Sequence, residues 1–149
     1  MMTVMANTTL ATVRSAVQES RRRDKVVLAD LTGTPSRFGG VGVADVLARS
    51  REMRQVGLEW VVLYRGTDEA LSGRERTVQH FGIIDGLAAL GLRVSVAGGV
   101  SLETCGLYGA HPVCILVVGQ AIAGAADPQA AAQAFRQRLN ALWPDPLPA

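Results

Sequence analysis

The chain has 149 residues, of which 48% are hydrophobic and 19% charged, and its formal net charge is +2. These values indicate one soluble globular domain with a sizeable core, and so small a charge gives no sign of a nucleic-acid partner. No apolar stretch reaches the ~18 residues of a membrane span, and Met1 to Leu10 lacks a signal-peptide pattern, so the cytoplasm is the expected location.

Five short apolar, β-branched runs recur along the chain, with helical patterns between them. They are Met2 to Met5, Lys25 to Leu31, Glu59 to Tyr64, Arg93 to Ala97 and Val113 to Val118. Their apolar cores are continuous rather than alternating, which is typical of strands covered on both faces. We therefore predict five parallel strands joined by crossover helices, the first of them reading like the interior of a strand.

Helical periodicity fills the gaps between these runs. The expected apolar faces are Leu10, Val13 and Val17; Val43, Val46, Leu47, Ser50 and Met53; Val78, Phe81, Ile84 and Ala88; a short piece near Leu102 to Tyr108; and Ala131, Phe135, Leu139 and Leu142. Asn7 or Thr8 is expected to cap the first helix. Asp127 and Pro128 begin the last helix and Pro144 ends it. We interpret the basic run from Arg21 to Lys25 as a solvated helix end.

The number of units leaves two architectures open. Each strand-to-strand spacing is close to one βα unit, so five units use up residues 1–143 and leave a short tail, 144–149. A closed barrel needs eight such units and typically about 250 residues. The sequence therefore predicts either an open five-stranded α/β sheet or a (β/α)8 barrel that lacks three units.

Isolated cysteines and histidines give no sign of a metal site. Cys105 and Cys114 show neither CxxC nor histidine-cluster spacing, so we expect two buried, reduced thiols. His80 and His111 are each expected to stand alone among apolar neighbours, without metal-ligand spacing.

Candidate binding residues follow the strands, because ligands of α/β folds lie beyond the carboxyl ends of the strands. Gly98 and Gly99 follow the fourth run, and Gly119 and Gln120 follow the fifth. Glycine lets the backbone approach a ligand closely, and a short helix beginning near Gly119 would point free amides at an anion. Each glycine turn alone is explained by turn geometry, but the two together predict a phosphate cradle.

Polar residues also follow the second and third runs. Asp30 either caps a turn or faces the substrate. Tyr64, Arg65 and Thr67 follow the third run, where Arg65 either binds an anionic or polyol substrate or forms a surface salt bridge.

Four segments resemble a known family. VAGGVSLET (Val96 to Thr104), the stretch from Ile115 to Trp143, LYRGTDEAL (Leu63 to Leu71) and LADLTGT (Leu28 to Thr34) resemble the 3-hexulose-6-phosphate synthase and 3-keto-L-gulonate-6-phosphate decarboxylase family, within the orotidine-monophosphate decarboxylase suprafamily. The resemblance covers nearly the whole chain. It implies that the five strands are strands four to eight of a partial (β/α)8 TIM barrel.

The resemblance implies a carbon-carbon lyase acting on a phosphosugar through a magnesium-bound enediolate. Asp30, Thr67 and Ala97 match the synthase, which condenses formaldehyde with ribulose 5-phosphate, whereas the decarboxylase tends to have Glu, Arg and Thr there. We therefore favour the synthase, with the decarboxylase as the alternative. Family members also imply a homodimer.

The chain departs from the family pattern in three places. Tyr64 stands at the catalytic histidine, and a phenol is a poor proton shuttle near neutral pH. Gln120 replaces the phosphate-binding arginine, for which Arg65 could compensate. No Asp-x-Lys-x-x-Asp motif occurs, so the magnesium ligands are absent from this chain. Two interpretations follow: association with a missing N-terminal segment, or a non-catalytic phosphate-binding barrel remnant.

Overall fold

Five parallel strands form one sheet in the computed structural model, which describes residues 1–32, 43–64 and 74–144. The strands are β1 (Met2–Met5), β2 (Val27–Asp30), β3 (Trp60–Tyr64), β4 (Arg93–Ala97) and β5 (Val113–Val117). All five predicted strands are confirmed, with ends that shift by no more than two residues. Each strand pairs with its neighbours in sequence, in the order β1-β2-β3-β4-β5. A doubly wound sheet reverses its strand order at a switch point, so this consecutive order is that of a barrel and confirms a partial one.

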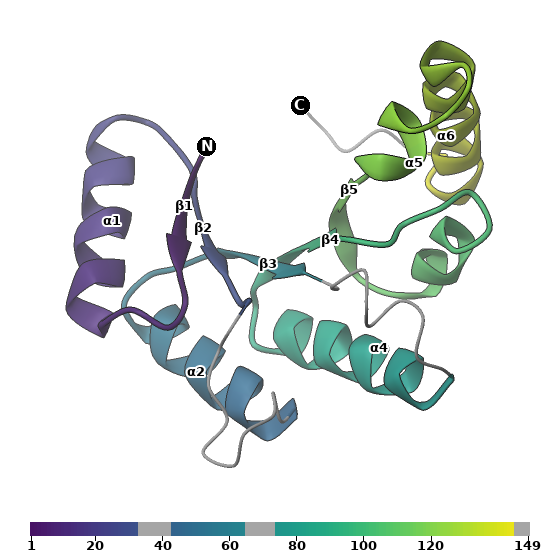
Figure 1. Ribbon diagram of the computed structural model, residues 1–149. Coiled ribbons are helices and arrows are strands. Elements are labelled where there is room, and N and C mark those ends of the chain that lie inside the picture. The colour runs from purple at the N-terminus through teal and green to yellow at the C-terminus, as the bar shows by residue number, and fades with distance from the viewer. Residues whose placement is uncertain (33–42, 65–73, 145–149) are drawn as a thin grey trace.

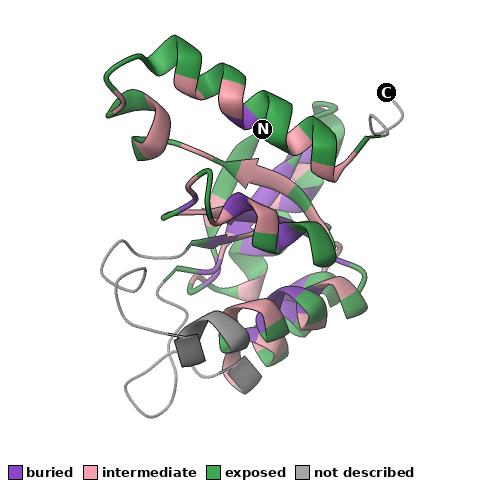
Figure 2. Ribbon diagram, turned by 90° about the vertical axis from the view of Figure 1, so that its right-hand side faces the viewer, coloured by how far each residue is buried: buried purple, intermediate pink, exposed green. Residues whose placement is uncertain are grey.

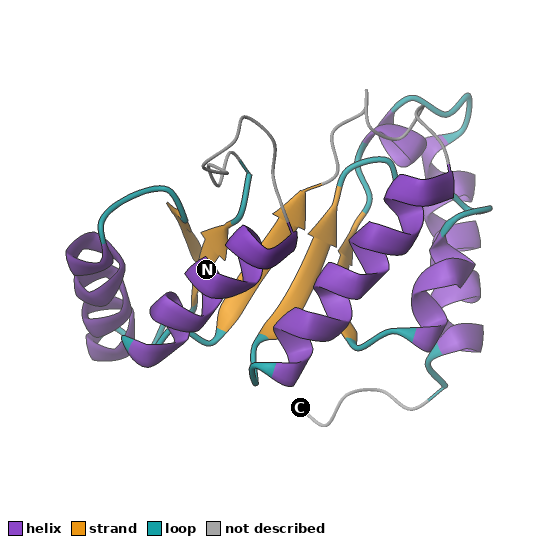
Figure 3. Cartoon of the chain, turned by 90° about the horizontal axis from the view of Figure 1, so that it is seen from below, coloured by secondary structure: helices purple, strands orange, loops and turns teal. Residues whose placement is uncertain are grey.

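Helices connect successive strands along one side of the sheet. They are α1 (Leu10–Arg22), α2 (Val43–Gln55), α4 (Arg74–Ala89), the 3-10 helix η1 (Cys105–Ala110), α5 (Gln120–Ala123) and α6 (Pro128–Leu142). Figures 1 and 3 show α1, α2, α4 and α6 along the outer side of a curved sheet, whose concave side carries none of these helices. Right-handed crossovers place the helices of consecutive parallel strands on one face, as this arrangement requires.

The core lies between the convex face of the sheet and the helices. Val61 and Val94 of the central strands are fully buried, as are Met53 of α2 and Ile84 of α4. Burying a side chain of this size contributes about 1.5–3 kcal/mol. In Figure 2 the buried residues gather on the central strands and on the helix surfaces turned toward them. Val13, Val46, Ile84 and Phe135 of the predicted apolar helix faces are therefore part of the core, while the side chains of Val43 and Val78 lie outside the described residues.

Two helix starts test the capping predictions. The Oδ1 atom of Asp127 accepts a hydrogen bond from the backbone N of Ala130 at 3.0 Å, and Pro128 opens α6, as predicted. The cap expected at Asn7 or Thr8 is wrong, because Thr9 caps α1. The backbone of Thr8 is still part of the turn after β1, since its N donates to the carbonyl of Met5. The helix therefore begins one residue later.

A β-bulge in β5 corrects one cysteine prediction. The register moves from Val94 beside Val113 to Ser95 beside Ile115, which leaves Cys114 without a partner in the ladder. Cys114 is exposed, whereas Cys105 is buried as expected, and both thiols are free. The expected burial of Cys114 is wrong because β5 is the last strand of the sheet.

The two histidines form contacts rather than standing alone. His111 Nδ1 lies 2.8 Å from Asp85 Oδ1, and its ring stacks on Phe81 with 4.3 Å between ring centroids. His80 Nε2 lies 3.4 Å from the hydroxyl of Tyr108. The expectation that each histidine stands alone was therefore wrong. Helix α4, which carries His80 and Asp85, meets η1 and His111 only in the folded chain.

The basic run from Arg21 to Lys25 is exposed, as predicted, although Arg21 also donates a hydrogen bond to the carbonyl of Gly57 at 3.1 Å. Among the described helices, none combines the length and the apolar character needed to cross a bilayer.

Candidate active site

The carboxyl edge of the sheet carries three of the residues that the sequence singles out. In the strand register Asp30 lies beside Val62, Tyr64 beside Ala97, and Ala97 beside Val117. Because Val61 and Leu63 face the helices, their alternate neighbours face the concave side. The structure therefore brings Asp30, Tyr64 and Ala97 to one face and one edge.

Asp30 adopts one of the two roles that the sequence left open. Its Oδ1 atom accepts a hydrogen bond from the backbone N of Thr32 at 2.8 Å, so the side chain closes an Asx turn. Oδ2 makes no hydrogen bond with another described residue. One carboxylate oxygen thus fixes the orientation of the side chain and leaves the other for a ligand.

Tyr64 is the last residue of β3, and 46% of it is exposed. Its position at the strand end and its exposure leave the ring accessible from the concave side. Arg65 and Thr67, which were also singled out, lie outside the described residues.

Gly98 and Gly99 turn the chain sharply at the end of β4. Their φ angles are +86° and +65°, in the left-handed region where a side chain is strained. Reciprocal hydrogen bonds hold the far side of the turn: Ser101 N donates to Thr104 Oγ1 at 2.9 Å, and Thr104 N donates to Ser101 Oγ at 3.3 Å. This hydroxyl pair was missed in the sequence, although Ser and Thr side chains commonly hydrogen-bond to nearby backbone groups in turns.

Glu103 lies in the same turn and is fully exposed. Ser101 Oγ donates to its Oε2 at 2.6 Å, and this hydrogen bond lowers the pKa of the Glu103 carboxyl. The turn therefore carries a stable negative charge at neutral pH.

Gly119 begins the short helix α5, as the sequence predicts. Its φ of −112° is open to any residue, and an added Cβ would meet no atom within 4 Å. Gln120 is exposed, and its side-chain Nε2 lies 2.8 Å from where a Cβ on Gly124 would be, one turn further along. Reaching an anion beside Gly119 therefore requires another rotamer of Gln120.

Comparison with known proteins identifies relatives along most of the chain. The 3-hexulose-6-phosphate synthase of Mycobacterium gastri is 32% identical over 144 residues, which are 93% of this chain and 61% of the relative. The 3-keto-L-gulonate-6-phosphate decarboxylase of Escherichia coli is 30% identical over 95 residues, 64% of this chain and 44% of the relative. The crystal structure of 3-hexulose-6-phosphate synthase from Salmonella typhimurium superposes with a TM-score of 0.73 at 25% identity, covering 94% of this chain and 61% of that one.

The chain belongs to the 3-hexulose-6-phosphate synthase and 3-keto-L-gulonate-6-phosphate decarboxylase family. It spans about three fifths of the length of the M. gastri synthase. No protein-family model matches it. The relatives are named as a synthase and a decarboxylase, so membership establishes a lyase-type family and not the reaction.

The magnesium ion implied for this synthase and decarboxylase family does not fit the described residues. Within the described ranges, no three His, Cys, Asp or Glu side chains lie together as metal ligands. Magnesium prefers an octahedron of oxygen ligands, and Asp30 offers one carboxylate with one oxygen already hydrogen-bonded. These residues therefore assign no chemical step to a metal ion.

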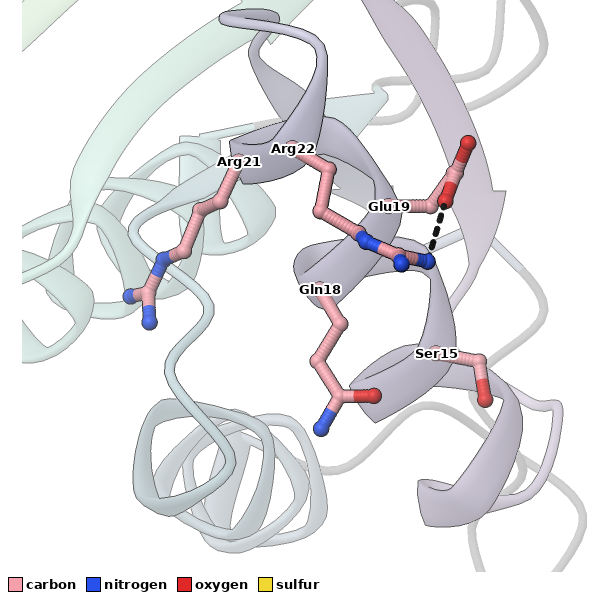
Figure 4. Close-up of a pocket in the computed structure, with 5 residues that line it drawn as sticks. All are labelled: Ser15, Gln18, Glu19, Arg21 and Arg22. Carbon is pink, nitrogen blue, oxygen red and sulfur yellow. Dashed lines mark ion pairs between the residues drawn. The ribbon is translucent and has the colours of Figure 1, made fainter.

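One surface hollow in the described chain lies away from this edge. Figure 4 shows Ser15, Gln18, Glu19, Arg21 and Arg22 of α1 lining it, with an ion pair of 3.7 Å between Arg22 and Glu19. Arg21 and Arg22 end α1 just before β2 begins, so the hollow lies near the amino ends of the strands. Because family ligands are expected at the opposite edge, we assign the site to the strand ends and not to this hollow.

Proposed function

We propose that the chain forms the phosphate-binding mouth of a sugar-phosphate carbon-carbon lyase of the 3-hexulose-6-phosphate synthase type. The reaction is the aldol condensation of formaldehyde with ribulose 5-phosphate. One observation carries the proposal: the Gly98–Gly99 turn and Gly119 follow neighbouring parallel strands at the same edge, because Ala97 pairs with Val117.

The phosphate is held by backbone amides in this proposal. The turn at Gly98 and Gly99 and the open space around Gly119 let an anion approach the main chain. Gln120 adds an amide without charge where the family has arginine. Replacing a charged hydrogen bond with a neutral one weakens binding by about 1–3 kcal/mol, so we expect weaker phosphate binding than in an arginine-containing relative.

The reacting end of the sugar lies toward Asp30 and Tyr64 in the same proposal. The free oxygen of Asp30 accepts a proton or a hydroxyl hydrogen bond, and Tyr64 donates a hydrogen bond to a substrate oxygen. Ala97 between Tyr64 and Val117 leaves room for the sugar. Arg65 and Thr67 stay predictions as a further catalytic residue and a specificity residue.

A glycine substitution tests phosphate binding without straining the fold. We expect Gly119→Ala to weaken the binding of ribulose 5-phosphate several-fold, because its methyl group occupies the space that the phosphate needs. Gly82→Ala is the matched control, since a Cβ there also meets nothing within 4 Å but lies in α4. Calorimetric titration of both variants measures the change. Equal affinity of the unsubstituted chain, Gly119→Ala and Gly82→Ala would show that Gly119 does not contribute to phosphate binding.

Product analysis separates the candidate reactions. The chain is assayed with and without the part of the M. gastri synthase that it does not match. Formaldehyde-dependent loss of ribulose 5-phosphate supports the synthase. Carbon dioxide release from 3-keto-L-gulonate 6-phosphate supports the decarboxylase, which the E. coli relative favours. Binding of ribulose 5-phosphate without either reaction supports the non-catalytic remnant, which Tyr64 and Gln120 favour.

We propose a cytoplasmic homodimer for the assembled enzyme, on the strength of the family resemblance. In this proposal its magnesium ligands come from outside the described residues. Light scattering at micromolar concentration tests the dimer, and a strictly monomeric mass contradicts it.

A further inference from the structure

A second hollow lies where two turns meet at the amino ends of the strands. The turn from α1 to β2 forms one wall, and the turn from α2 to β3 forms the other. Its apolar lining includes Val17, Val27 and Trp60, and its charged lining consists of Arg21, Lys25 and Glu59. The hollow is therefore a charged recess with an apolar wall, at the edge opposite the proposed phosphate cradle.

The size of this hollow suits a small ion. Its volume is about 110 Å³, whereas sites for drug-sized ligands measure roughly 300–1,000 Å³. A water molecule takes up ~30 Å³ of liquid, so the hollow holds roughly four water-sized groups. Four oxygens around a central atom, as in phosphate, make a group of this size.

Positive charge predominates around the hollow. Arg21 and Lys25 line it and Glu59 opposes them, while Arg93 pairs with Trp60 in the sheet and places its guanidinium carbon 5.3 Å from the centroid of that ring. Three cations and one carboxylate give these four groups a net charge of +2. Within the described ranges, no ion pair involves Lys25 or Arg93. The hollow therefore favours an anion over a cation.

Arg21 already spans the two turns. Its side chain leaves α1 on the side away from Glu19 and Arg22 (Figure 4). Its Nη2 donates to the carbonyl of Gly57 at 3.1 Å and lies 3.6 Å from Glu59 Oε1. Guanidinium has five N–H donors, and no other described residue takes one of them from Arg21. The group is thus held in place with donors left for a ligand.

The end of α1 fixes where Lys25 leaves the main chain. Asp24 N donates to the carbonyl of Arg21 at 3.3 Å, and Lys25 N donates to the carbonyl of Ser20 at 2.8 Å. This pair of hydrogen bonds is a Schellman motif, in which Asp24, with a φ of +52°, takes the left-handed position that glycine usually occupies. Lys25, the one lysine of the sequence, therefore starts from a fixed point on the wall of the hollow.

We propose that this hollow binds a tetrahedral oxyanion, either inorganic phosphate or the phosphoryl group of a small metabolite. Arg21 and Lys25 contact the anion, and Arg93 adds charge from beside Trp60. The bound anion ties the turn after α1 to the turn after α2. The inference concerns the amino edge of the sheet, so it holds whichever reaction, if any, takes place at the carboxyl edge.

Residue-resolved NMR of the full chain tests the site. The probe is inorganic phosphate, which replaces chloride at constant ionic strength. We expect saturable shifts of the backbone amides of Lys25 and Gly57 and of the indole N–H of Trp60, half complete at about millimolar phosphate. Absence of these shifts, or equal shifts with chloride alone, overturns the proposal. Glycerol 3-phosphate is the second probe: the same shifts support a phosphoryl group as the occupant, and a response to inorganic phosphate alone supports the free ion.

Charge variants at the hollow give opposite expected effects. Lys25→Gln should weaken phosphate binding at least about fivefold, because a charged donor is lost. Glu59→Gln should strengthen it several-fold, since it removes the carboxylate that competes for Arg21. Arg22→Gln is the matched control, because Arg22 is 81% exposed, does not line this hollow and should leave the affinity unchanged. Equal affinities of the three variants contradict the assignment, and a Glu59→Gln protein that binds more weakly contradicts the role of charge.

The two edges of the sheet are separated by one further variant. Gly119→Ala, which alters the proposed phosphate cradle, should leave the shifts of Lys25 and Gly57 unchanged. Phosphate binding at the amino edge without any response of Gly98, Gly99 or Gly119 would contradict the proposed function and leave this inference intact. Loss of the amino-edge shifts in Gly119→Ala would overturn it, because the response would then originate at the other edge.

Discussion

A single guanidinium holds the loop that follows β1. Arg49 of α2 donates from Nε to the carbonyl of Ala6 at 2.8 Å, from Nη2 to the carbonyl of Thr8, and from Nη1 to Glu52 at 2.8 Å. Only 19% of its side chain is exposed. Since Met5 pairs with Asp30, this loop leaves the same edge as the candidate site. Arg49 is thus a positioning residue that links a helix to the carboxyl edge.

Removing this guanidinium should destabilise the fold. We expect Arg49→Met to lower the free energy of unfolding by about 1.5–3 kcal/mol, because two backbone carbonyls lose charged donors. Urea denaturation monitored by circular dichroism measures the change. Arg51→Met, at an exposed neighbour on the same helix, should change stability by less than about 0.5 kcal/mol. Equal stability of the two variants would show that the contacts of Arg49 contribute nothing.

The hydrogen bond between Ser101 and Glu103 should be visible in a titration. Ser101→Ala should raise the pKa of the Glu103 carboxyl toward its ordinary value, because the hydroxyl donor is its largest cause of lowering. A folded-state pKa below the unfolded one stabilises the fold above the ordinary carboxyl range, and this contribution disappears as the pH falls through the lowered pKa. Carbon-detected NMR measures the shift, with Ser15→Ala as the control. An unchanged pKa would contradict the role of Ser101.

Two glycines of α4 show how this helix meets α2. A Cβ on Gly86 would lie 2.8 Å from the terminal methyl carbons of Leu47, whereas a Cβ on Gly82 would meet nothing within 4 Å. Gly86 therefore allows close packing of the two helices, and Gly82 has no packing role of this kind. Both residues weaken a helix interior relative to alanine.

The two alanine substitutions should therefore change the free energy of unfolding by different amounts, or in opposite directions. Gly82→Ala should raise the free energy of unfolding by about 0.5–1 kcal/mol through helix propensity alone. Gly86→Ala gains the same propensity but displaces Leu47, and overpacking costs about 1–3 kcal/mol. Chemical denaturation of both proteins compares them. A Gly86→Ala protein as stable as Gly82→Ala would show that Leu47 moves without cost.

The helices and strands were largely predictable from the sequence. The exact start of α1 and the bulge in β5 were not. Continuous apolar runs identified all five strands, but the expected cover on both faces was wrong for the outer strands, since Met5 and Val117 on the concave face are largely exposed. The start of α1 at Thr9 depends on a turn hydrogen bond between Thr8 and Met5, which single-residue preferences do not reveal. The bulge at Cys114 depends on how β5 aligns with β4, and no local pattern encodes that alignment.

At the scale of the whole molecule, the consecutive strand order determines which residues meet. It places Asp30, Tyr64, Ala97 and the glycine turns at one edge, as the rule for strand ends predicts from sequence. The concave face carries no described helix (Figure 1) because right-handed crossovers between consecutive strands place all the connecting helices on the other face. The contact of His111 with Asp85 joins residues 26 positions apart. It could not be predicted from the sequence, because it depends on how the folded elements pack.

The two thiols should report this architecture in solution. Cys114 is exposed on the last strand and should react with a maleimide in the native chain, while Cys105 is fully buried and should react only through unfolding. Mass spectrometry of labelled peptides over time measures the two rates. Destabilising variants such as Arg49→Met should increase the labelling rate of Cys105 and leave the labelling rate of Cys114 unchanged. Similar rates for the two native thiols would contradict the described packing around Cys105.

The sequential pairing of the strands also bears on biosynthesis. Each strand hydrogen-bonds to the one made immediately before it, so β1 and β2 can join while later residues are still inside the ribosome. Every completed unit then offers a ready template for its successor. Assembly can thus proceed from the amino terminus onward, without waiting for the carboxyl terminus to emerge.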